Sequence, residues 1–441
     1  MATIDANPAS GTRDLLPAEV ARRERAFATI RRTFDAHGFA PLDTPAFERL
    51  EVLTGKYGEE GDQLIFKILR RGDHEASGDT DLALRYDLTV PLARVAARYG
   101  SQLPTPFKRY QIAPVWRADR PGKGRYREFF QCDVDTIGSD SLTADAATLV
   151  AVTDALEALG LDGFRVQLNS RKALRGLVEA YGIPAELESE ALTALDKLDK
   201  IGIDGVAAEL AGRGIAAEAV EALGVDLDAA DRATAVRSRL ERSAVGQEGL
   251  VEVDRVLALV DGVVPVTYAP VLARGLSYYT GPVFEVVHDG LDATIAAGGR
   301  YDGLIGMFQA NDVPATGGSL GLERILLLLE QAEAGAAAGA SQQGPQVLVT
   351  VMDEDGAGDA LAIAARVRAA GLSVEPYSGG GRLKLAKQLK YADRRGVRVA
   401  VIRGGDERAA ATVTCKALAT GEQRTVPLEH LEATLAELLE A

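Results

Sequence analysis

The chain of 441 residues is long enough for two or three domains with substantial hydrophobic cores. Its composition, 47% hydrophobic and 26% charged, is ordinary for a soluble globular protein, and it contains neither a signal-peptide pattern nor the ~20 consecutive apolar residues of a membrane span. The net charge of −15 argues against a protein that coats nucleic acid non-specifically, although local basic patches could still contact a specific RNA.

The N-terminal region predicts a long amphipathic helix from about Ala18 to His37, followed by a strand over residues 39–44 that runs into Pro45. Residues 82–91, which contain the sequence LRYDLTVP, predict a strand that turns into a helix. Asp87 and Thr89 lie directly before that helix. They either cap it, which is the commonest use of such residues, or accept hydrogen bonds from a substrate ammonium group.

Residues 109–137 predict two antiparallel strands joined by a basic loop over residues 120–125. Side chains two apart in a strand share a face, so the second strand presents one set of residues together: Phe129, Gln131, Asp133 and Asp135. Arg117 ends the neighbouring strand, and arginine forks match phosphate oxygens. This face therefore suits phosphate, adenine and a small cationic ligand, or else it is the polar outer face of an exposed hairpin.

A helix is predicted over residues 145–159, a strand over 164–169, mostly helical structure over 171–261 and a strand over 264–272. The next segment, 273–285, is a turn that presents Arg274, Tyr278 and Tyr279. Adjacent tyrosines in a strand face opposite ways, so we expect one to pack in the core and the other to line a pocket. Simple core or hairpin packing is the alternative for both.

Residues 297–304, AGGRYDGL, form a glycine-rich strand end where backbone can approach a ligand closely. Residues 316–324 predict a strand that leads into a helix, with Arg324 at the start of the helix. An arginine in this position either binds a triphosphate or is solvated at the surface. A linker is expected over residues 331–345, which are small and flexible.

Beyond the linker, short apolar strands at 347–351, 373–377 and 397–402 alternate with helices, which predicts βαβ units around a mostly parallel sheet. The helix over about 382–394 carries basic residues on one face, which favours an RNA contact over a merely solvated surface. These residues are Lys384, Lys387, Lys390 and Arg394.

Metal and disulfide chemistry have little support in the sequence. The two cysteines, Cys132 and Cys415, are far apart and give no disulfide framework, which fits a reducing, cytoplasmic location. The four histidines are scattered, so we predict no protein-bound metal site.

Several of these segments resemble the signatures of class II aminoacyl-tRNA synthetases and, within them, of the histidyl-tRNA synthetases. The hairpin resembles motif 2 in its RP, KGRYREF and QCD sequences, and residues 316–324 resemble motif 3. LRYDLTVP, ARGLSYYTGPVFE and GGRYDG resemble histidine-specific segments of the family. The N-terminal helix, strand and proline resemble motif 1, which forms the dimer interface in the family.

The resemblance implies an α+β fold, with the antiparallel class II sheet flanked by helices. It implies a catalytic domain over residues 1–330 with a helical insertion at about 171–261, the linker 331–345, and a C-terminal α/β anticodon-binding domain over 346–441. The implied activity is ATP-dependent activation of L-histidine to histidyl-adenylate and transfer to the 3′ end of tRNA(His). Mg²⁺ would accompany ATP, and the protein would be a cytoplasmic homodimer.

The resemblance also assigns site residues. Catalytic roles fall to Arg117 and Arg274. Histidine binding falls to Asp87, Leu88, Thr89, Gln131, Asp135, Tyr278 and Tyr279. ATP binding falls to Arg117, Arg125, Phe129, Arg274 and Arg324. The expected tRNA contacts are Lys123, Lys384, Lys387, Lys390 and Arg394.

Two positions depart from the family pattern. Ser277 stands where the family often has aspartate, so we assign it no role. Gly122 stands where several bacterial relatives have glutamine, so we expect relaxed or different reading of the extra guanine at position −1 of tRNA(His).

Three other functions remain open on the sequence. A catalytically inactive regulatory subunit of ATP phosphoribosyltransferase would share the core, but it could lose the arginines and the C-terminal domain that this chain keeps. A prolyl or threonyl enzyme is a second alternative, and the presence of Tyr278, Tyr279 and Asp135 argues against it. An RNA-binding module without chemistry would have no use for phosphate-binding arginines.

Overall fold

The computed structural model describes residues 4–72, 77–273, 278–335, 344–354, 356–380 and 384–440. The chain divides into two compact units. The first consists of Met1–Asp14 and Arg22–Gly335, and the second of Leu15–Ala21 and Ala336–Ala441. Among the described residues, no helix combines the length and the apolar character that crossing a membrane requires.

The first unit is built on a large sheet that contains eight strands in the described part of the chain. In spatial order these are β1 (Ala40–Pro41), β5 (Phe107–Trp116), β6 (Glu128–Ile137), β11 (Ala315–Gly321), β10 (Leu291–Arg300), β9 (Pro282–His288), β7 (Phe164–Ser170) and β8 (Val266–Tyr268). Neighbours run antiparallel except at the two edges, where β1 pairs with β5 and β7 with β8 in parallel. The predicted α+β class and the predicted hairpin are both confirmed, and Arg109 lies directly opposite Asp135.

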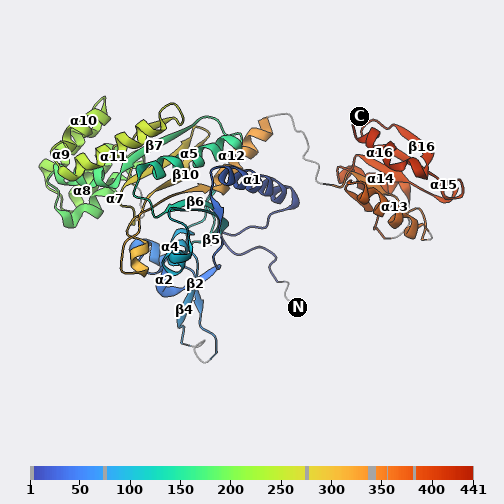
Figure 1. Ribbon diagram of the computed structural model, residues 1–441, viewed down its shortest axis with the longest axis horizontal. Coiled ribbons are helices and arrows are strands. Elements are labelled where there is room, and N and C mark those ends of the chain that lie inside the picture. Colours follow the sequence, from blue (N-terminus) through green and yellow to red (C-terminus); the bar gives the residue numbers. More distant parts are fainter. Residues whose placement is uncertain are drawn as a thin grey trace. The chain divides into compact units, whose positions relative to one another are not determined.

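One face of this sheet is covered by helices (Figure 1). These are α1 (Pro17–Ala36), α5 (Leu142–Ala158), α11 (Ala244–Val260) and α12 (Leu322–Gly335). Cys132 and Val134 of β6 are buried there in the same core as Phe27 and Phe34 of α1. Because side chains alternate along a strand, Phe129, Gln131, Asp133 and Asp135 point to the other face, as predicted.

The second face of the sheet meets α4 (Thr89–Tyr99), which follows β4 (Thr80–Leu84) as the sequence predicts. A three-stranded antiparallel sheet in the described residues joins β4 to β2 (Phe47–Arg49) and β3 (Lys67–Leu69). The short helices α2 (Leu50–Leu53) and α3 (Gly58–Gln63) lie between these strands in sequence. A shared hydrophobic cluster that includes Leu53, Leu92 and Tyr301 fixes this layer against the main sheet.

Helices make up most of the segment 171–260, which the sequence predicts to be a helical insertion. It contains α6 (Arg171–Ala180), α7 (Glu188–Leu195), α8 (Leu198–Gly212), α9 (Ala217–Asp228), α10 (Arg232–Leu240) and α11. Residues 173–240 form a hydrophobic cluster of their own, whereas Val253, Val256 and Val260 of α11 belong to the core of the main sheet. Helix α11 thus attaches the insertion to the sheet.

The predicted strand over 264–272 is too long, since β8 covers only Val266–Tyr268. The chain leaves the ladder at Pro270, which has no N–H to donate. The buried Asn169 amide instead donates to the carbonyls of Pro270 and Leu272, at 3.1 and 3.3 Å.

The second unit has a five-stranded sheet in the described residues, in the order β13 (Val374–Pro376), β12 (Val347–Val349), β14 (Val399–Ile402), β15 (Thr412–Ala417) and β16 (Gln423–Pro427). Helices α13 (Ala357–Ala369), α14 (Leu385–Arg394), α15 (Gly405–Ala409) and α16 (Leu431–Glu440) accompany it. The parallel strands β13, β12 and β14 confirm the predicted βαβ units. The antiparallel pair β15–β16 was not predicted, although β15, with the sequence TVTCKA, alternates polar with apolar residues.

Candidate active site

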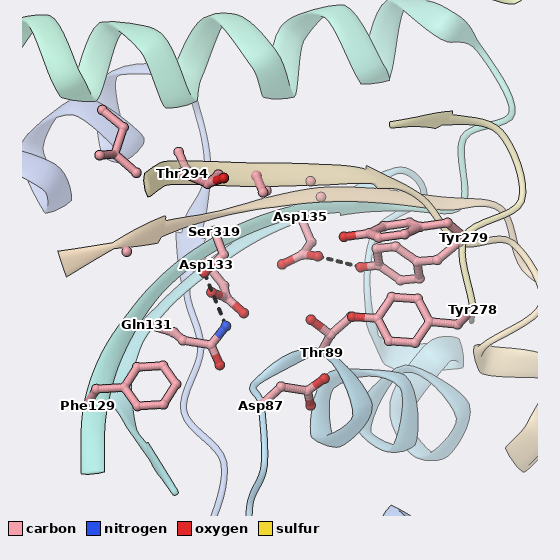
Figure 2. Close-up of a pocket in the computed structure, with 18 of the residues that line it drawn as sticks. Asp87, Thr89, Phe129, Gln131, Asp133, Asp135, Tyr278, Tyr279, Thr294 and Ser319 are labelled. Atoms are coloured by element: carbon pink, nitrogen blue, oxygen red, sulfur yellow. Dashed lines mark hydrogen bonds between the residues drawn. The ribbon is translucent and has the colours of Figure 1, made fainter. Parts of the chain in front are cut away.

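A cavity of about 370 Å³ opens on the second face of the main sheet. Five separate segments line it: the turn before α4, the hairpin β5–β6, the tyrosine pair, the strands β10 and β11, and the start of α12 (Figure 2). Most of the predicted site residues meet there: Asp87, Thr89, Arg117, Phe129, Gln131, Asp135, Tyr278, Tyr279 and Arg324. Residues 200 or more positions apart in the chain therefore share one hollow.

Other predicted residues do not line this cavity. Leu88 is buried in a small cluster with Ala113 and Val115, and Arg125 is exposed and pairs with Asp119 at 2.7 Å. Lys123 is exposed on the hairpin loop.

Arg274 and Ser277 lie outside the described residues. In the second unit, four predicted basic residues are exposed, at the start of and along α14: Lys384, Lys387, Lys390 and Arg394.

Asp135 is held by a buried network at one end of the cavity. Arg109, which is fully buried, pairs with Asp135 at 2.8 Å, and the Tyr301 hydroxyl donates to the other carboxylate oxygen. Burial raises the pKa of Asp135, while Arg109 and Tyr301 oppose that rise. Asp135 is therefore a rigid acceptor whose charge is partly balanced by Arg109.

Glycine is required directly beside this carboxylate. Gly317 of β11 pairs with Asp135 across the sheet, and a Cβ on Gly317 would lie 1.9 Å from Asp135 Oδ1. A Cβ on Gly298 of β10 would in turn lie 2.1 Å from the Gly317 carbonyl oxygen. The glycine-rich strands thus leave the room that the Asp135 carboxylate occupies.

Asp87 caps helix α4, which is one of the two roles that the sequence offered for it. Its Oδ1 accepts hydrogen bonds from the Val90 N–H at the start of α4 and from the Tyr57 hydroxyl, both at 3.0 Å. Its Oδ2 is buried and has no hydrogen-bond partner among the described residues. Burial raises the pKa of the Asp87 carboxyl. One oxygen caps the helix and the other is available to a ligand.

Asp133 lies between Gln131 and Asp135 on the cavity face of β6 (Figure 2). Burial, together with the neighbouring Asp135 charge, raises the pKa of Asp133 to about 7, although Arg109 opposes the shift. The sequence placed Asp133 on this face but gave it no role.

The tyrosine prediction is wrong in one respect. Tyr278 and Tyr279 precede β9 rather than lying in a strand, so they do not alternate, and both line the cavity. Their ring centroids are 5.1 Å apart, and Tyr278 also contacts Tyr301 at 5.9 Å. Burial raises the pKa of the Tyr278 and Tyr301 hydroxyls well above 10, so both stay protonated as hydrogen-bond donors.

The other end of the cavity carries arginine and an aromatic ring. Arg117 donates through Nε to the Tyr86 carbonyl at 3.0 Å, and its guanidinium lies 5.2 Å from the centroid of Phe129. Arg324 donates to the Thr294 carbonyl at 2.5 Å. A polar, carboxylate-rich end is thus joined to a cationic, aromatic end, and this arrangement suits a small polar ligand beside a nucleotide.

Five side chains that line the cavity or contact its lining residues carry no predicted role: Tyr57, Arg109, Asp133, Tyr301 and Ser319. Arg109 could have been found from the hairpin register, which sets it opposite Asp135. Tyr301 stands in the GGRYDG segment that the sequence singled out. Nothing local marks Tyr57 or Ser319. Among the described residues, no group of three or more His, Cys, Asp or Glu side chains is arranged to hold a metal ion.

Comparisons with known proteins agree with this geometry. The family model of histidyl-tRNA synthetase matches residues 11–325, and that of the anticodon binding domain matches residues 346–438. The histidine–tRNA ligase of Cytophaga hutchinsonii is 40% identical, over 96% of this chain and 97% of its own.

Solved structures show the same fold. The histidyl-tRNA synthetase of Nostoc sp. PCC 7120 is 32% identical and superposes with a TM-score of 0.79, covering 99% of this chain and 100% of its own. A Bacillus halodurans structure described as an ATP phosphoribosyltransferase regulatory subunit/histidyl-tRNA synthetase, 23% identical, shares the fold with a TM-score of 0.71 over 88% of this chain and 97% of its own. On the length and identity of these matches, the chain belongs to the histidyl-tRNA synthetase family.

Proposed function

We propose that this protein is a histidine–tRNA ligase, which activates L-histidine with ATP and transfers it to the 3′ end of tRNA(His). The observation that carries the proposal is the single cavity that joins Asp135 and its tyrosines to Arg117 and Arg324. Histidine binds at the carboxylate end, and ATP binds at the arginine end.

Activation is a displacement at phosphorus. The histidine carboxylate oxygen attacks the α-phosphate in line, the bond to the β-phosphate oxygen breaks, and pyrophosphate leaves. Arg117, together with Arg274, binds the α-phosphate and stabilises the negative charge that grows on it. The protein contributes mainly by positioning the two substrates and by this charge stabilisation.

Phe129 stacks under adenine, and Arg125 and Arg324 bind the outer phosphates. Arg125 does not line the cavity, so its role requires the hairpin loop to move or ATP to reach beyond the hollow. Mg²⁺ bound to the triphosphate would neutralise part of its negative charge. In the second reaction the terminal ribose 3′-hydroxyl takes the acyl group and AMP leaves.

Selection of histidine follows from the buried network. Asp135, with Tyr278 or Tyr279, binds the imidazole, while Asp87, Thr89 and Gln131 bind the amino group. A site built on such hydrogen bonds rejects analogues by ~10⁴ or more, because an analogue leaves buried polar groups unpaired.

Recognition of tRNA involves both units of the chain. We propose catalytic and anticodon-binding domains at about residues 1–330 and 346–441, with the linker 331–345 between them; helix α12 extends to Gly335. The exposed basic residues of α14 contact the RNA, as does Lys123 on the hairpin loop. The protein acts as a cytoplasmic homodimer through its motif 1 segment.

ATP–pyrophosphate exchange, run with each amino acid in turn, tests the proposal. Exchange with histidine alone supports it. No exchange with any amino acid favours the regulatory subunit of ATP phosphoribosyltransferase, and exchange with another amino acid reassigns the substrate. Arg274→Ala should lower single-turnover adenylate formation by ~10² or more and spare histidine binding; a near-normal rate would remove Arg274 from the mechanism.

A further inference from the structure

Three buried oxygen atoms in the cavity have neither a hydrogen-bond partner nor an ion-pair partner among the described residues. They are Asp87 Oδ2, Gln131 Oε1 and Asp133 Oδ1. All three belong to residues that line the same hollow, and Figure 2 shows Gln131 and Asp133 on the strand and Asp87 on the segment beside α4. Buried polar atoms without partners are costly in a protein, so three in one cavity indicate a ligand that donates to them.

The chemistry of the ligand group follows from the three acceptors. An ammonium group carries three N–H donors and a positive charge, so it satisfies three acceptors at once, two of which are carboxylate oxygens. A neutral amine or hydroxyl supplies fewer donors and leaves the carboxylate charge unbalanced.

Asp133 differs from Asp135 in having no cation of its own. Asp135 pairs with Arg109, but no ion pair within 4 Å joins Asp133 to a cation in the described part of the chain. Arg85, which also faces this region, donates to the backbone carbonyls of Thr44 and Pro114. Ser319 hydrogen-bonds Asp133, and the charge of Arg109 acts on it from beyond ion-pair distance. A buried carboxylate without an ion-pair partner is disfavoured, so a cationic ligand group would stabilise Asp133.

The Thr89 hydroxyl, which the sequence assigned to the amino group, hydrogen-bonds Tyr278 and can accept one further hydrogen bond. Ser319 similarly accepts from Gln131 Nε2 at 3.2 Å, which turns the Gln131 carbonyl oxygen toward other partners. Asp133 therefore adds to Asp87, Gln131 and Thr89 an oxygen atom that no described residue hydrogen-bonds.

Position along the strand agrees with this assignment. Alternate residues of a strand are roughly 7 Å apart, so Asp133 lies one step from Asp135 and two steps from the Phe129 end. With the imidazole at Asp135, the amino group of the same histidine reaches Asp133, and the carboxylate is directed toward Arg117.

We propose that Asp133 is a further histidine-binding residue, which receives the α-ammonium group of the amino acid together with Asp87 and Gln131. The proposal rests on the function proposed above and adds a specificity determinant to it. The raised pKa of Asp133 agrees with this role, because a carboxyl of that pKa gains most from a cation placed beside it.

The test compares two ligands on two proteins by calorimetric titration. The ligands are L-histidine and 3-(imidazol-4-yl)propanoate, which is histidine without its amino group. Asp133→Asn keeps the shape of the side chain and removes its charge, so histidine should bind about 10- to 100-fold more weakly while the deaminated ligand is unchanged within twofold. Asp140→Asn is the matched control, because Asp140 is exposed just beyond β6 and should leave both affinities unchanged.

Each remaining outcome decides the proposal. Unchanged histidine affinity in Asp133→Asn, or an equal loss for both ligands, overturns it. If Asp133→Asn fails to fold, Asp133→Ser is titrated in its place, with the same selective loss expected. If the wild-type protein shows no histidine-dependent ATP–pyrophosphate exchange, the proposed function itself is wrong. If the wild type shows normal exchange but Asp133→Asn does not weaken histidine selectively, only this inference is wrong.

Discussion

Arg109 and Asp135 form an ion pair across β5 and β6, with a separation of 2.8 Å and side-chain exposures of 0% and 3%. Arg109 also donates to the Leu88 carbonyl at 3.3 Å. One buried guanidinium thus joins the hairpin to the turn that carries Asp87 and Thr89. This pair fixes the position of Asp135 relative to the segment that carries Asp87 and Thr89.

We predict that Arg109→Met lowers the free energy of unfolding by about 3–5 kcal/mol, because it leaves Asp135 buried without a cation. The double variant Arg109→Met/Asp135→Asn should recover most of that loss, since neither charge remains. The double variant should nevertheless have a low affinity for histidine, because the Asp135 carboxylate that accepts from the ligand is gone. Urea denaturation and histidine titration check the two effects. A single variant within 1 kcal/mol of wild type contradicts the prediction.

The affinity for histidine should depend on pH through Asp133. The charged and titratable groups around Asp133 come from several elements: Arg85, Asp87, Arg109, Asp135 and Tyr278. An ammonium ligand requires the carboxylate form, and the pKa of Asp133 is about 7. As pH falls below 7 the carboxyl takes up a proton, so histidine affinity decreases by up to about tenfold per pH unit.

The imidazole of free histidine titrates in the same range, so the comparison is with Asp133→Asn at each pH. The ratio of wild-type to variant affinity should rise about tenfold between pH 6 and pH 8. Calorimetry in buffers of different ionisation enthalpy should also show that, at pH 6.5, wild type releases more protons on binding histidine than Asp133→Asn does. Equal proton release in the two proteins would assign the pH dependence to the ligand alone.

Stability without ligand should change in the opposite direction with pH. The pKa of Asp133 is higher in the folded protein than its ordinary value of 3.8, so the folded state binds more protons between about pH 4 and 7. Wild-type stability is therefore lost as pH rises through that window, and Asp133→Asn removes the loss. The Tm of the variant relative to wild type should rise by at least about 2–4 °C from pH 5 to pH 8, the effect of roughly 1 kcal/mol. If the difference in Tm between Asp133→Asn and wild type stays constant from pH 5 to pH 8, Asp133 does not titrate in this range.

The sequence could predict the half of the site that the hairpin carries. Strand alternation alone puts Phe129, Gln131, Asp133 and Asp135 on one face, and the structure has them there. A fixed period makes such a prediction independent of the rest of the fold.

The supporting half could not be predicted in this way. Tyr301 reaches Asp135 from 166 residues away, and Tyr57, which directly precedes α3, reaches Asp87 from 30 residues away, so no local pattern links the partners. The same limit explains the tyrosine error: the period of two applies only inside a strand, and Tyr278 precedes one.

The N-terminal segment 10–13 should affect ATP binding without touching the cavity. The Gly11 carbonyl accepts from the Arg127 N–H at 2.8 Å, and the Arg13 guanidinium stacks 4.3 Å from the centroid of Tyr126. Arg13 also pairs with Glu323, the neighbour of Arg324. The segment thus braces the hairpin loop against the start of α12.

We therefore predict that Arg13→Met raises the KM for ATP about tenfold and leaves the KM for histidine within twofold, since one charge-assisted contact is lost at the nucleotide end. Arg22→Met is the matched control, because Arg22 pairs with Glu330 on the same helix α12 but farther along it, at 3.5 Å. An equal rise in both KM values would indicate general disruption of the site instead.

Gly122 offers a direct test of how the tRNA end is read. It forms a two-way backbone bridge with Arg125, each N–H donating to the other's carbonyl at 3.0 Å. A Cβ on Gly122 would meet nothing within 4 Å, so Gly122→Gln fits without rearranging the loop. Gly124 has a φ of +70°, and its Cβ would come within 3.0 Å of Leu327, so Gly124→Ala should strain the loop.

Transcripts of tRNA(His) with and without the −1 guanine separate the two effects. Wild type should lose less than ~100-fold in kcat/KM without that guanine, because glycine has no side chain to contact it, and a larger loss, about 2.7 kcal/mol or more, refutes relaxed reading. Gly122→Gln should increase the dependence on the guanine at unchanged Tm, since a glutamine amide can hydrogen-bond a base edge. Gly124→Ala should instead lower activity on both transcripts alike. Equal guanine dependence in wild type and Gly122→Gln would show that position 122 does not read the −1 base, because the added amide would then have made no contact with it.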